Sequence, residues 1–363
     1  MPLEIVRPGT RIDFIGRWRL WVGISLAVIA ISLAAIPLRG IRLGIDFAGG
    51  TEMLLRFEAG VATDEARVRA VLEGCGVAEP SVIRYGEEVA EYLVRFGTLG
   101  DPAVVTRAVE SGACPVAAAD RAALDAALAG SGSKDAMGSV VDRVTFAFRN
   151  AIGPLVVERV EFVGPKVGDD LRRGGLLAIA IACALILVYI GFRFSPRFAP
   201  GAVIALVHDV AITAGVFVIL GLEFDLRVLA AVLAVLGYSL NDTIIVYDRV
   251  RENMALRTKH DLAELLNLSV NQTLSRTLLT SVTTLMAVLA LLVLGGEVVR
   301  PFAIAMLIGI VVGTYSSIYI AAPTLLWLET RYAQRRGKGG SGEAGRSAHP
   351  SPPSAGRGRR ARA

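Results

Sequence analysis

The chain has 363 residues, of which 53% are hydrophobic, and a mean hydropathy of +0.56. It is too apolar for a soluble domain and too long for a single anchor, so we expect a bundle-forming membrane protein. The formal net charge of +5 does not indicate nucleic-acid binding, because the excess lies largely in the C-terminal tail and beside apolar runs. The three cysteines and three histidines share no ligand spacing, so neither a metal site nor a cofactor is expected.

The first apolar run, from Leu20 to Leu38, lies between Arg19 and Arg39 and is about as long as a ~30 Å hydrocarbon layer requires. It lacks the short core and the small-residue cleavage site of a signal peptide, so we expect an uncleaved anchor. Five further apolar runs follow along the chain. The predicted transmembrane helices are 19–38, 173–193, 198–221, 226–247, 276–296 and 301–328.

The polar segment 39–172 separates the first two spans and is long enough for a small domain. Its patterns predict strands at 52–57, 80–85, 90–96 and 155–163 and helices at 63–72 and 139–151. The predicted fold is a polytopic α-helical membrane protein with six transmembrane helices and a small α+β periplasmic domain between helices 1 and 2.

One stretch of the polar segment has no pattern that indicates a function. Residues 97–134 are rich in Ala, Gly and Ser and resemble an inserted arm or loop with a short helix at 120–128. We assign this stretch no function. The sequence also leaves open whether Cys75 and Cys114 pair, because a helix end and a loop position give no indication that the two are close.

Basic side chains flank the spans on one side of the membrane. They are Arg7, Arg11, Arg17, Arg19, Arg193, Arg197, Arg249, Arg251, Arg257 and Lys259. The positive-inside rule places this side, with both termini (1–18 and 329–363) and the loop 248–275, in the cytoplasm. Arg172 and Arg173 violate the rule beside Asp169 and Asp170. The basic tail 329–363 is expected to be disordered, either as a solvated end or as a segment attracted to anionic lipid or ribosomal RNA.

The fourth span is apolar until Asn241 and Asp242. At 1.5 Å per residue, Asp242 lies about 21 Å from the periplasmic start of the span, within the cytoplasmic half. A carboxylate there is costly to ionise unless a cation approaches, which is a property that a proton carrier needs. Arg276, at the mouth of span five, is the candidate cation. Protonation would release this pair and shift the packing of spans four and five; the alternative is a static pair that fixes helix register.

His208 and Asp209 lie near the middle of span three and could extend a proton path. For His208 the alternative is a hydrogen-bonded interior histidine, whereas Asp209 adds a second carboxylate with no cation in its own span. The segment Gly44-Ile-Asp-Phe-Ala-Gly-Gly-Thr51 leads from span one into the first strand, and its glycines permit a tight turn. By itself this double glycine is weak evidence, and the spacing does not fit a phosphate loop.

Five motifs in order along the chain resemble the SecF family of bacterial Sec translocase subunits, from about Arg7 to Leu328. They are Gly44 to Thr51 (including Asp46, Gly49 and Gly50), Phe162-Val-Gly-Pro-Lys-Val-Gly168, Ala205-Leu-Val-His-Asp-Val210, Gly237-Tyr-Ser-Leu-Asn-Asp-Thr243 with Asp248-Arg-Val-Arg-Glu-Asn253, and Thr273-Leu-Ser-Arg-Thr277. The resemblance implies a resistance-nodulation-division protein of the bacterial cytoplasmic (inner) membrane that uses the proton-motive force to promote preprotein export. In that family the proton path is held to include the residues that correspond to Asn241, Asp242 and Arg276.

The resemblance also implies partners: SecD, often YajC, the SecYEG channel, the SecA motor, the translocating preprotein and membrane lipids. The chain would supply half of a pseudo-symmetric bundle of about twelve helices. Three other functions are alternatives. A small-molecule or lipid exporter of the same superfamily is the main alternative, and a passive scaffold for SecD and YajC is another. An enzyme is not expected, because no nucleophile with a base, metal set or phosphate loop is evident.

Overall fold

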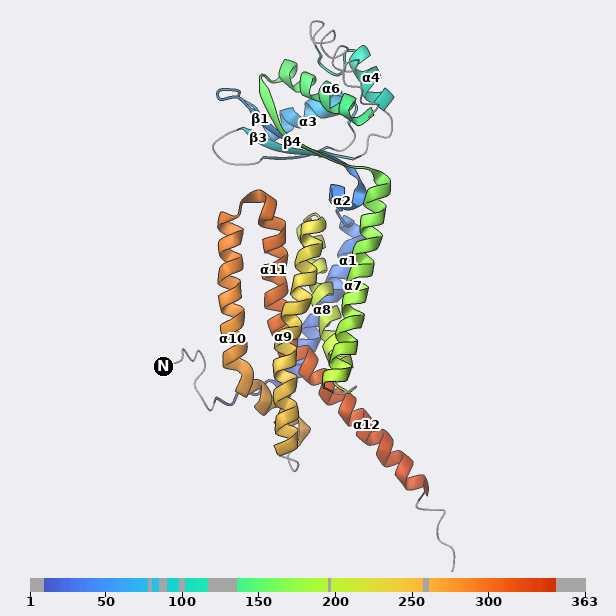
Figure 1. Ribbon diagram of the computed structural model, residues 1–363, viewed down its shortest axis with the longest axis vertical. Coiled ribbons are helices and arrows are strands. Elements are labelled where there is room, and N and C mark those ends of the chain that lie inside the picture. Colours follow the sequence, from blue (N-terminus) through green and yellow to red (C-terminus); the bar gives the residue numbers. More distant parts are fainter. Residues whose placement is uncertain are drawn as a thin grey trace, which may run out of the picture.

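The computed structural model describes residues 10–77, 80–84, 90–97, 102–116, 136–194, 197–256 and 261–343. A long helical bundle carries a small α+β domain at one of its ends (Figure 1). The helix predicted at 120–128 and the last part of the tail lie outside the described residues.

The bundle confirms the predicted fold class. Within the described residues, six helical segments are long and apolar enough to cross a membrane. They are α1 (Trp18–Arg39), α7 (Pro165–Arg193), α8 (Ala199–Leu220), α9 (Leu226–Leu256), α10 (Leu262–Leu294), and α11 (Gly296–Ser316), which continues through a π-helical turn (Ser317–Ala321) into α12 (Ala322–Glu343). The helices α8 and α9 are among the most buried and form much of the bundle interior.

Several helices run beyond the predicted spans. The segment α7 starts at Pro165, and most of the predicted loop 248–275 belongs to the ends of α9 and α10. An apolar run marks only the part of a helix that lies in hydrocarbon. The first turns of α10 are more polar, but they remain helical because one face of the helix, which includes Leu266 and Val270, is buried against the bundle. The helix α12 likewise extends past Leu328 into the tail that is expected to be disordered, and it ends at Glu343; the Glu, Arg, Ala and Gln residues up to Arg336 favour a helix, whereas the glycines after it do not.

The small domain is a four-stranded antiparallel sheet with helices on one face (Figure 1). Its strands are β1 (Gly50–Phe57), β2 (Ser81–Arg84), β3 (Glu91–Phe96) and β4 (Leu155–Val163), in the order β2-β3-β1-β4. The helices are α3 (Glu65–Gly74), α4 (Pro102–Glu110) and α6 (Ala136–Ala151). Side chains alternate along β1, so that Met53, Leu55 and Phe57 enter the core.

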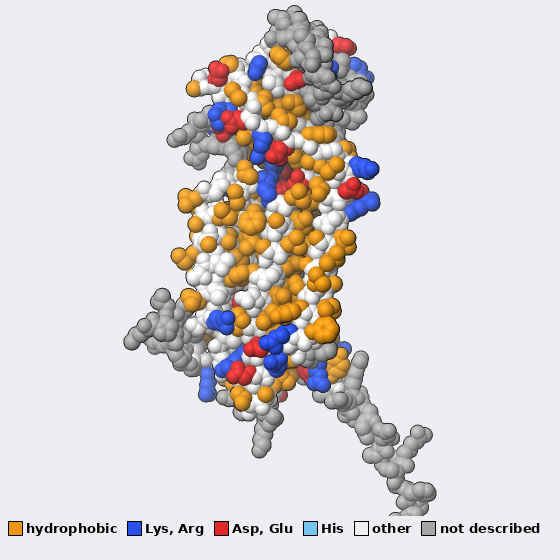
Figure 2. All heavy atoms as spheres, viewed as in Figure 1, with side chains coloured by type: hydrophobic (Ala, Val, Ile, Leu, Met, Phe, Trp, Pro, Cys, Tyr) orange, Lys and Arg blue, Asp and Glu red, His pale blue; other side chains and the backbone are white. Residues whose placement is uncertain are grey.

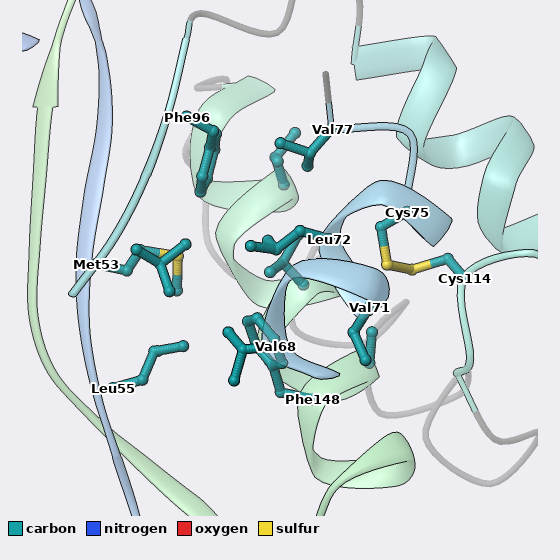
Figure 3. Close-up of a cluster of buried hydrophobic side chains, with 14 of the residues drawn as sticks. Met53, Leu55, Val68, Val71, Leu72, Cys75, Val77, Phe96, Cys114 and Phe148 are labelled. Atoms are coloured by element: carbon teal, nitrogen blue, oxygen red, sulfur yellow. A yellow bond between two sulfur atoms is a disulfide. The ribbon is translucent and has the colours of Figure 1, made fainter. Parts of the chain in front are cut away.

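The core of this domain lies between the sheet and its helices (Figure 3). Met53 and Leu55 face Leu72 and Phe148, and a disulfide joins Cys75, after α3, to Cys114, after α4. The stretch 97–134 is therefore not wholly an inserted arm, since α4 buries Val105 in the same core. The sequence left this pairing open because proximity between a helix end and a loop appears only in the folded chain.

Candidate functional site

Two carboxylates are buried inside the bundle, as the sequence predicted from their place in apolar spans. Asp209 on α8 is 0% exposed, and Asp242 on α9 is 1% exposed. The two helices pack against each other. The carboxylates nevertheless have very different surroundings.

Asp209 accepts hydrogen bonds at both oxygens. Its Oδ1 lies 2.9 Å from Nδ1 of His208, and its Oδ2 accepts from the hydroxyls of Ser239 at 2.5 Å and Ser316 at 2.8 Å. Ser239 comes from α9, and Ser316 is the last residue of α11 before the π-helical turn, an irregularity found frequently at functional sites. One carboxylate thus connects three helices. Neither serine was predicted as a site residue, because single hydroxyls are common in apolar spans.

Close packing brings these serines to Asp209. A Cβ atom at Gly313 of α11 would lie 2.9 Å from Cβ of Ser239, so only glycine permits this approach of α9 and α11. His208 stacks on Tyr315 with 6.2 Å between the ring centroids, and the Tyr315 hydroxyl donates to the carbonyl of Trp21 at 2.6 Å. The network around Asp209 therefore extends from α8 to α1.

Asp242 has no such network. Neither of its carboxylate oxygens has a hydrogen-bond partner among the described residues. Arg276 on α10 is close enough to interact electrostatically with Asp242, but among the described residues no ion pair joins the two. The carboxylate lies one helical turn beyond Ser239 on the same buried face of α9. Its charge is therefore not compensated by a direct contact, which is costly at this depth.

A polar cleft of about 570 Å³ lies between α7, α9 and α10, close to Asp242. Its lining residues are Tyr189, Arg193, Phe194, Ile244, Ile245, Asp248, Arg249, Glu252, Gln272, Thr273 and Arg276. Arg276 is an exposed part of this lining, and Ile245 is one turn along α9 from Asp242. The cleft thus reaches within about one helical turn of Asp242 along α9, and Arg276 forms part of its opposite wall on α10.

Asn241 is exposed on α9 and does not share the buried face of Asp242. The structure therefore does not bring it to the carboxylate. Thr277, which was not predicted as a site residue, has a buried hydroxyl without a partner in the described part of the chain. A repeat of small hydroxyl residues every four positions on α10 (Ser269, Thr273, Thr277 and Ser281) is the sequence signal that could have found it, since all four are buried.

The double-glycine turn lies at the junction of the bundle and the small domain. Gly49 and Gly50 have φ angles of 73° and 145°, which side-chain-bearing residues rarely adopt. A Cβ at Gly168 of α7 would lie 3.0 Å from the backbone nitrogen of Gly49, so the turn and α7 need glycine on both sides. Asp46 accepts a hydrogen bond from the backbone nitrogen of Leu226 at 2.9 Å, at the start of α9. Thr51 is buried in β1.

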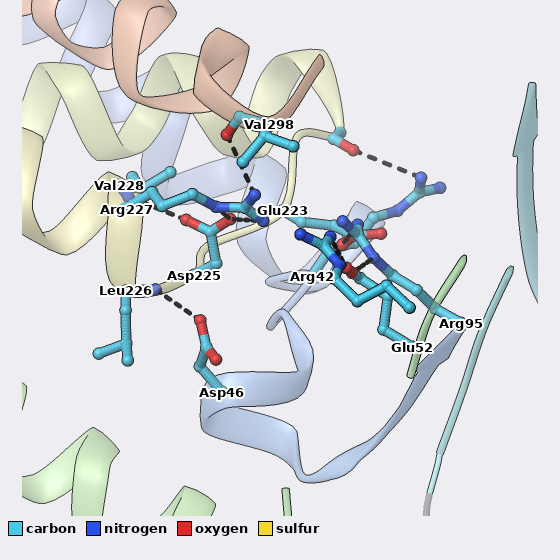
Figure 4. A network of polar contacts seen from close by, with 12 residues as sticks. Arg42, Asp46, Glu52, Arg95, Glu223, Asp225, Leu226, Arg227, Val228 and Val298 are labelled. Atoms are coloured by element: carbon cyan, nitrogen blue, oxygen red, sulfur yellow. Dashed lines mark hydrogen bonds and ion pairs between the residues drawn. The ribbon is translucent and has the colours of Figure 1, made fainter. Parts of the chain in front are cut away.

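An ionic network that the sequence did not reveal lies beside this turn (Figure 4). Arg95 of β3 pairs with Glu52 of β1 at 2.5 Å and with Glu223 of the α8–α9 loop. Burial lowers the pKa of Arg95, but the carboxylates of Glu223 and Glu52 outweigh burial and raise that pKa above its ordinary value. Arg95 therefore stays charged and joins the sheet to the bundle.

Comparison with known proteins places both regions in one family. The model of the C-terminal part of the SecD/SecF protein export membrane proteins matches residues 144–331, and the SecD/SecF GG motif matches residues 34–61. A protein translocase subunit SecF from Cereibacter sphaeroides is 40% identical over 90% of this chain and 92% of its own length. The chain belongs to the SecF family. A SecF from Pseudomonas aeruginosa is 41% identical over 89% of this chain and 93% of its own.

Solved structures agree with this membership. The crystal structure of SecDF from Thermus thermophilus, described as a translocon-associated membrane protein, matches with a TM-score of 0.68 and 35% identity. That match covers 89% of this SecF-family chain and 39% of the SecDF chain. A SecDF structure in a super-membrane-facing form matches with a TM-score of 0.61 and 36% identity over 93% and 41% of the two chains. The first family model includes Asp209, Asp242 and Arg276, and the second includes the double-glycine turn.

Proposed function

We propose that this SecF-family chain acts with a SecD chain and uses the proton-motive force to promote Sec-dependent export of preproteins. In this proposal Asp242 binds and releases the proton, and Arg276 stabilises its charged form from the cleft. The observation that carries the proposal is the 1% exposed carboxylate of Asp242, which has no hydrogen-bond partner among the described residues. A group held by fixed donors resists a change of charge, whereas this one has no such donors.

The proposed partners follow from the relatives. SecDF chains combine in one polypeptide a region like this chain with a longer remainder, since the chain covers 41% of the Thermus thermophilus SecDF. We infer that a separate SecD supplies that remainder here, and that YajC, SecYEG and SecA join the assembly. Asn241, exposed on α9, is available to such a partner. In this proposal Asn241 takes part in the proton path only when the partner chain is bound.

The proposed orientation places the small domain in the periplasm and both termini in the cytoplasm, across the inner membrane. Basic side chains gather at the end of the bundle opposite the small domain (Figure 2). Arg193 and Arg251 meet there through a hydrogen bond of 3.4 Å to the Arg193 carbonyl, and Arg197 lies 3.7 Å from Glu329. This distribution supports the orientation through the positive-inside rule.

Translocation into inverted membrane vesicles tests the proposal. The vesicles would carry wild-type protein, Asp242→Asn, Arg276→Ala or the control Asp248→Asn, and preprotein uptake would be measured with and without a proton gradient. Asp248 is an exposed acid on the same helix that lines the cleft with Arg276, so its variant shows whether loss of any carboxylate near the cleft has the same effect. We expect Asp242→Asn to abolish the gradient-dependent part of uptake and to spare the rest. Full gradient-dependent uptake by Asp242→Asn would exclude Asp242 as the proton carrier and favour the scaffold alternative.

A further inference from the structure

An apolar groove lies between α1 and α7, and its lining shares no residue with the polar cleft. The helices α1 and α7 both pack against α8 but make few or no contacts with each other. The space between them is a groove of about 570 Å³ whose floor is formed by α8 and α9. Its rim includes Leu33 of α1 and Leu176 of α7, which are 61% and 66% exposed. The groove is therefore open toward the hydrocarbon that surrounds the bundle.

The groove has the depth of one lipid leaflet. On α8 its lining runs from Val210 to Val218, which is about 12 Å at 1.5 Å per residue. Half of a hydrocarbon layer is about 15 Å. Ala211 and Ala214 lie on the floor, and their short side chains leave the space that larger residues would fill. The shape thus suits a single extended acyl chain.

A cation lies at the end of the groove nearest the small domain. Arg172 lines the groove there, and its side chain is 48% exposed although it pairs with Asp169 at 2.5 Å. Arg173 pairs with the same Asp169 at 2.9 Å, and Lys166 adds a third basic residue against Asp169 and Asp170. The start of α7 is therefore net positive, at the level where lipid headgroups would lie.

The other charge in the groove is already compensated. Asp225 also lines this end, but its carboxylate lies 2.6 Å from the guanidinium of Arg227 and accepts the backbone nitrogen of Val228. A phosphate at Arg172 would therefore meet a cation rather than a free acid. Arg172 and Arg173 violate the positive-inside rule, because they lie on the side of the membrane that carries the small domain. A site for a lipid headgroup would explain basic residues on that side.

We propose that this groove is a binding site for a membrane phospholipid of the leaflet next to the small domain. One acyl chain lies between α1 and α7 on the alanines of α8, and the lipid phosphate lies at Arg172. The lipid is a resident ligand that fills the gap between the two helices and is not a transported substrate. The proposal goes beyond the proposed function and does not depend on Asp242.

Photocrosslinking of the full chain in detergent tests the proposal. The probe is phosphatidylglycerol with a diazirine midway along one acyl chain, and mass spectrometry maps the labelled peptides. We expect label on the facing sides of α1, α7 and α8. Ala214→Phe or Ala211→Phe should reduce this label to the level on the exposed face of α10. Ala27→Phe adds the same ring to the exposed, opposite side of α1 and should leave the label unchanged.

The headgroup contact has a matched pair of variants. Arg172→Gln should reduce groove label about fivefold, the equivalent of about 1 kcal/mol for one cation near a lipid phosphate. Arg173→Gln removes a neighbouring cation with the same acidic partner, but Arg173 does not line the groove, so its label should change little. Equal loss in the two variants would overturn the placement of the phosphate.

Two results would overturn the site itself. The first is label that is spread evenly over the apolar surface and is unchanged by Ala211→Phe and by Ala214→Phe. Gel filtration and melting temperature would show that these two variants are folded. If one variant does not fold, the other still decides, because each alanine lies on the same floor. The second is loss of groove label when the chain is assembled with its SecD partner, which would assign the groove to a protein helix.

Discussion

The two buried carboxylates of the bundle contrast in what surrounds them. Asp209 and Asp242 are equally buried on neighbouring helices, yet Asp209 accepts from two serine hydroxyls and contacts His208, whereas Asp242 has no hydrogen-bond partner in the described chain. Burying a carboxylate costs several kcal/mol, and fixed donors offset that cost only at Asp209. Depth in a span therefore identifies an important carboxylate, but its partners decide whether its charge can change.

The largest expected effect is the loss of Asp209. Replacement by alanine leaves Ser239 and Ser316 without their shared acceptor, and hydrogen bonds to a charged group contribute about 1.5–3 kcal/mol each. We expect Asp209→Ala to lower the free energy of unfolding by about 4 kcal/mol. Denaturant titration of the purified chain in detergent would measure this change in the free energy of unfolding. Asp242→Asn is the control, and we expect it to keep or slightly raise stability, since it removes an uncompensated charge.

The contrast between the two carboxylates would be wrong if Asp242→Asn lowered the free energy of unfolding more than Asp209→Ala did. A stable Asp209→Ala with an unstable Asp242→Asn would mean that Asp242 holds the helices together as a static group. That result would support the register-fixing alternative for Asp242 and would assign the proton-carrying role to another group.

The serine contacts should each contribute less. Ser239→Ala and Ser316→Ala each remove one donor to Asp209 Oδ2, and we expect each to lower the free energy of unfolding by about 2 kcal/mol. A double-mutant cycle with Asp209→Asn would isolate the coupling. Ser281→Ala, which removes a contact of 2.7 Å to the neutral Thr314 hydroxyl, serves as the control and should cost about 1 kcal/mol. Equal losses at all three positions would show that the charge of Asp209 adds nothing.

Sequence reasoning predicted the parts of the fold that follow from composition along one segment. Six apolar runs gave six membrane helices, and alternation along β1 gave a core-facing strand. It named Asp209, Asp242 and Arg276 as candidates because charges in spans are conspicuous, and the structure buries the two carboxylates and leaves Arg276 exposed. It could not predict Ser239 or Ser316, whose importance depends on a helix contact at Gly313. The pairing of Cys75 with Cys114 and the network at Arg95 likewise depend on distant segments meeting.

The smallest expected effect concerns the cation beside Asp242. Arg276→Gln removes the positive charge that interacts with the Asp242 carboxylate from the cleft. Because Arg276 is exposed and makes no ion pair with Asp242 in the part of the chain that the structure describes, loss of its charge should cost only about 1 kcal/mol, and gradient-dependent preprotein uptake should fall roughly fivefold rather than vanish. Arg249→Gln is matched, since Arg249 lines the same cleft but is held by Glu252 and Gln272 at 2.6 Å each. An equal fall in both variants would show that the cleft needs positive charge in general and that Arg276 has no specific role toward Asp242.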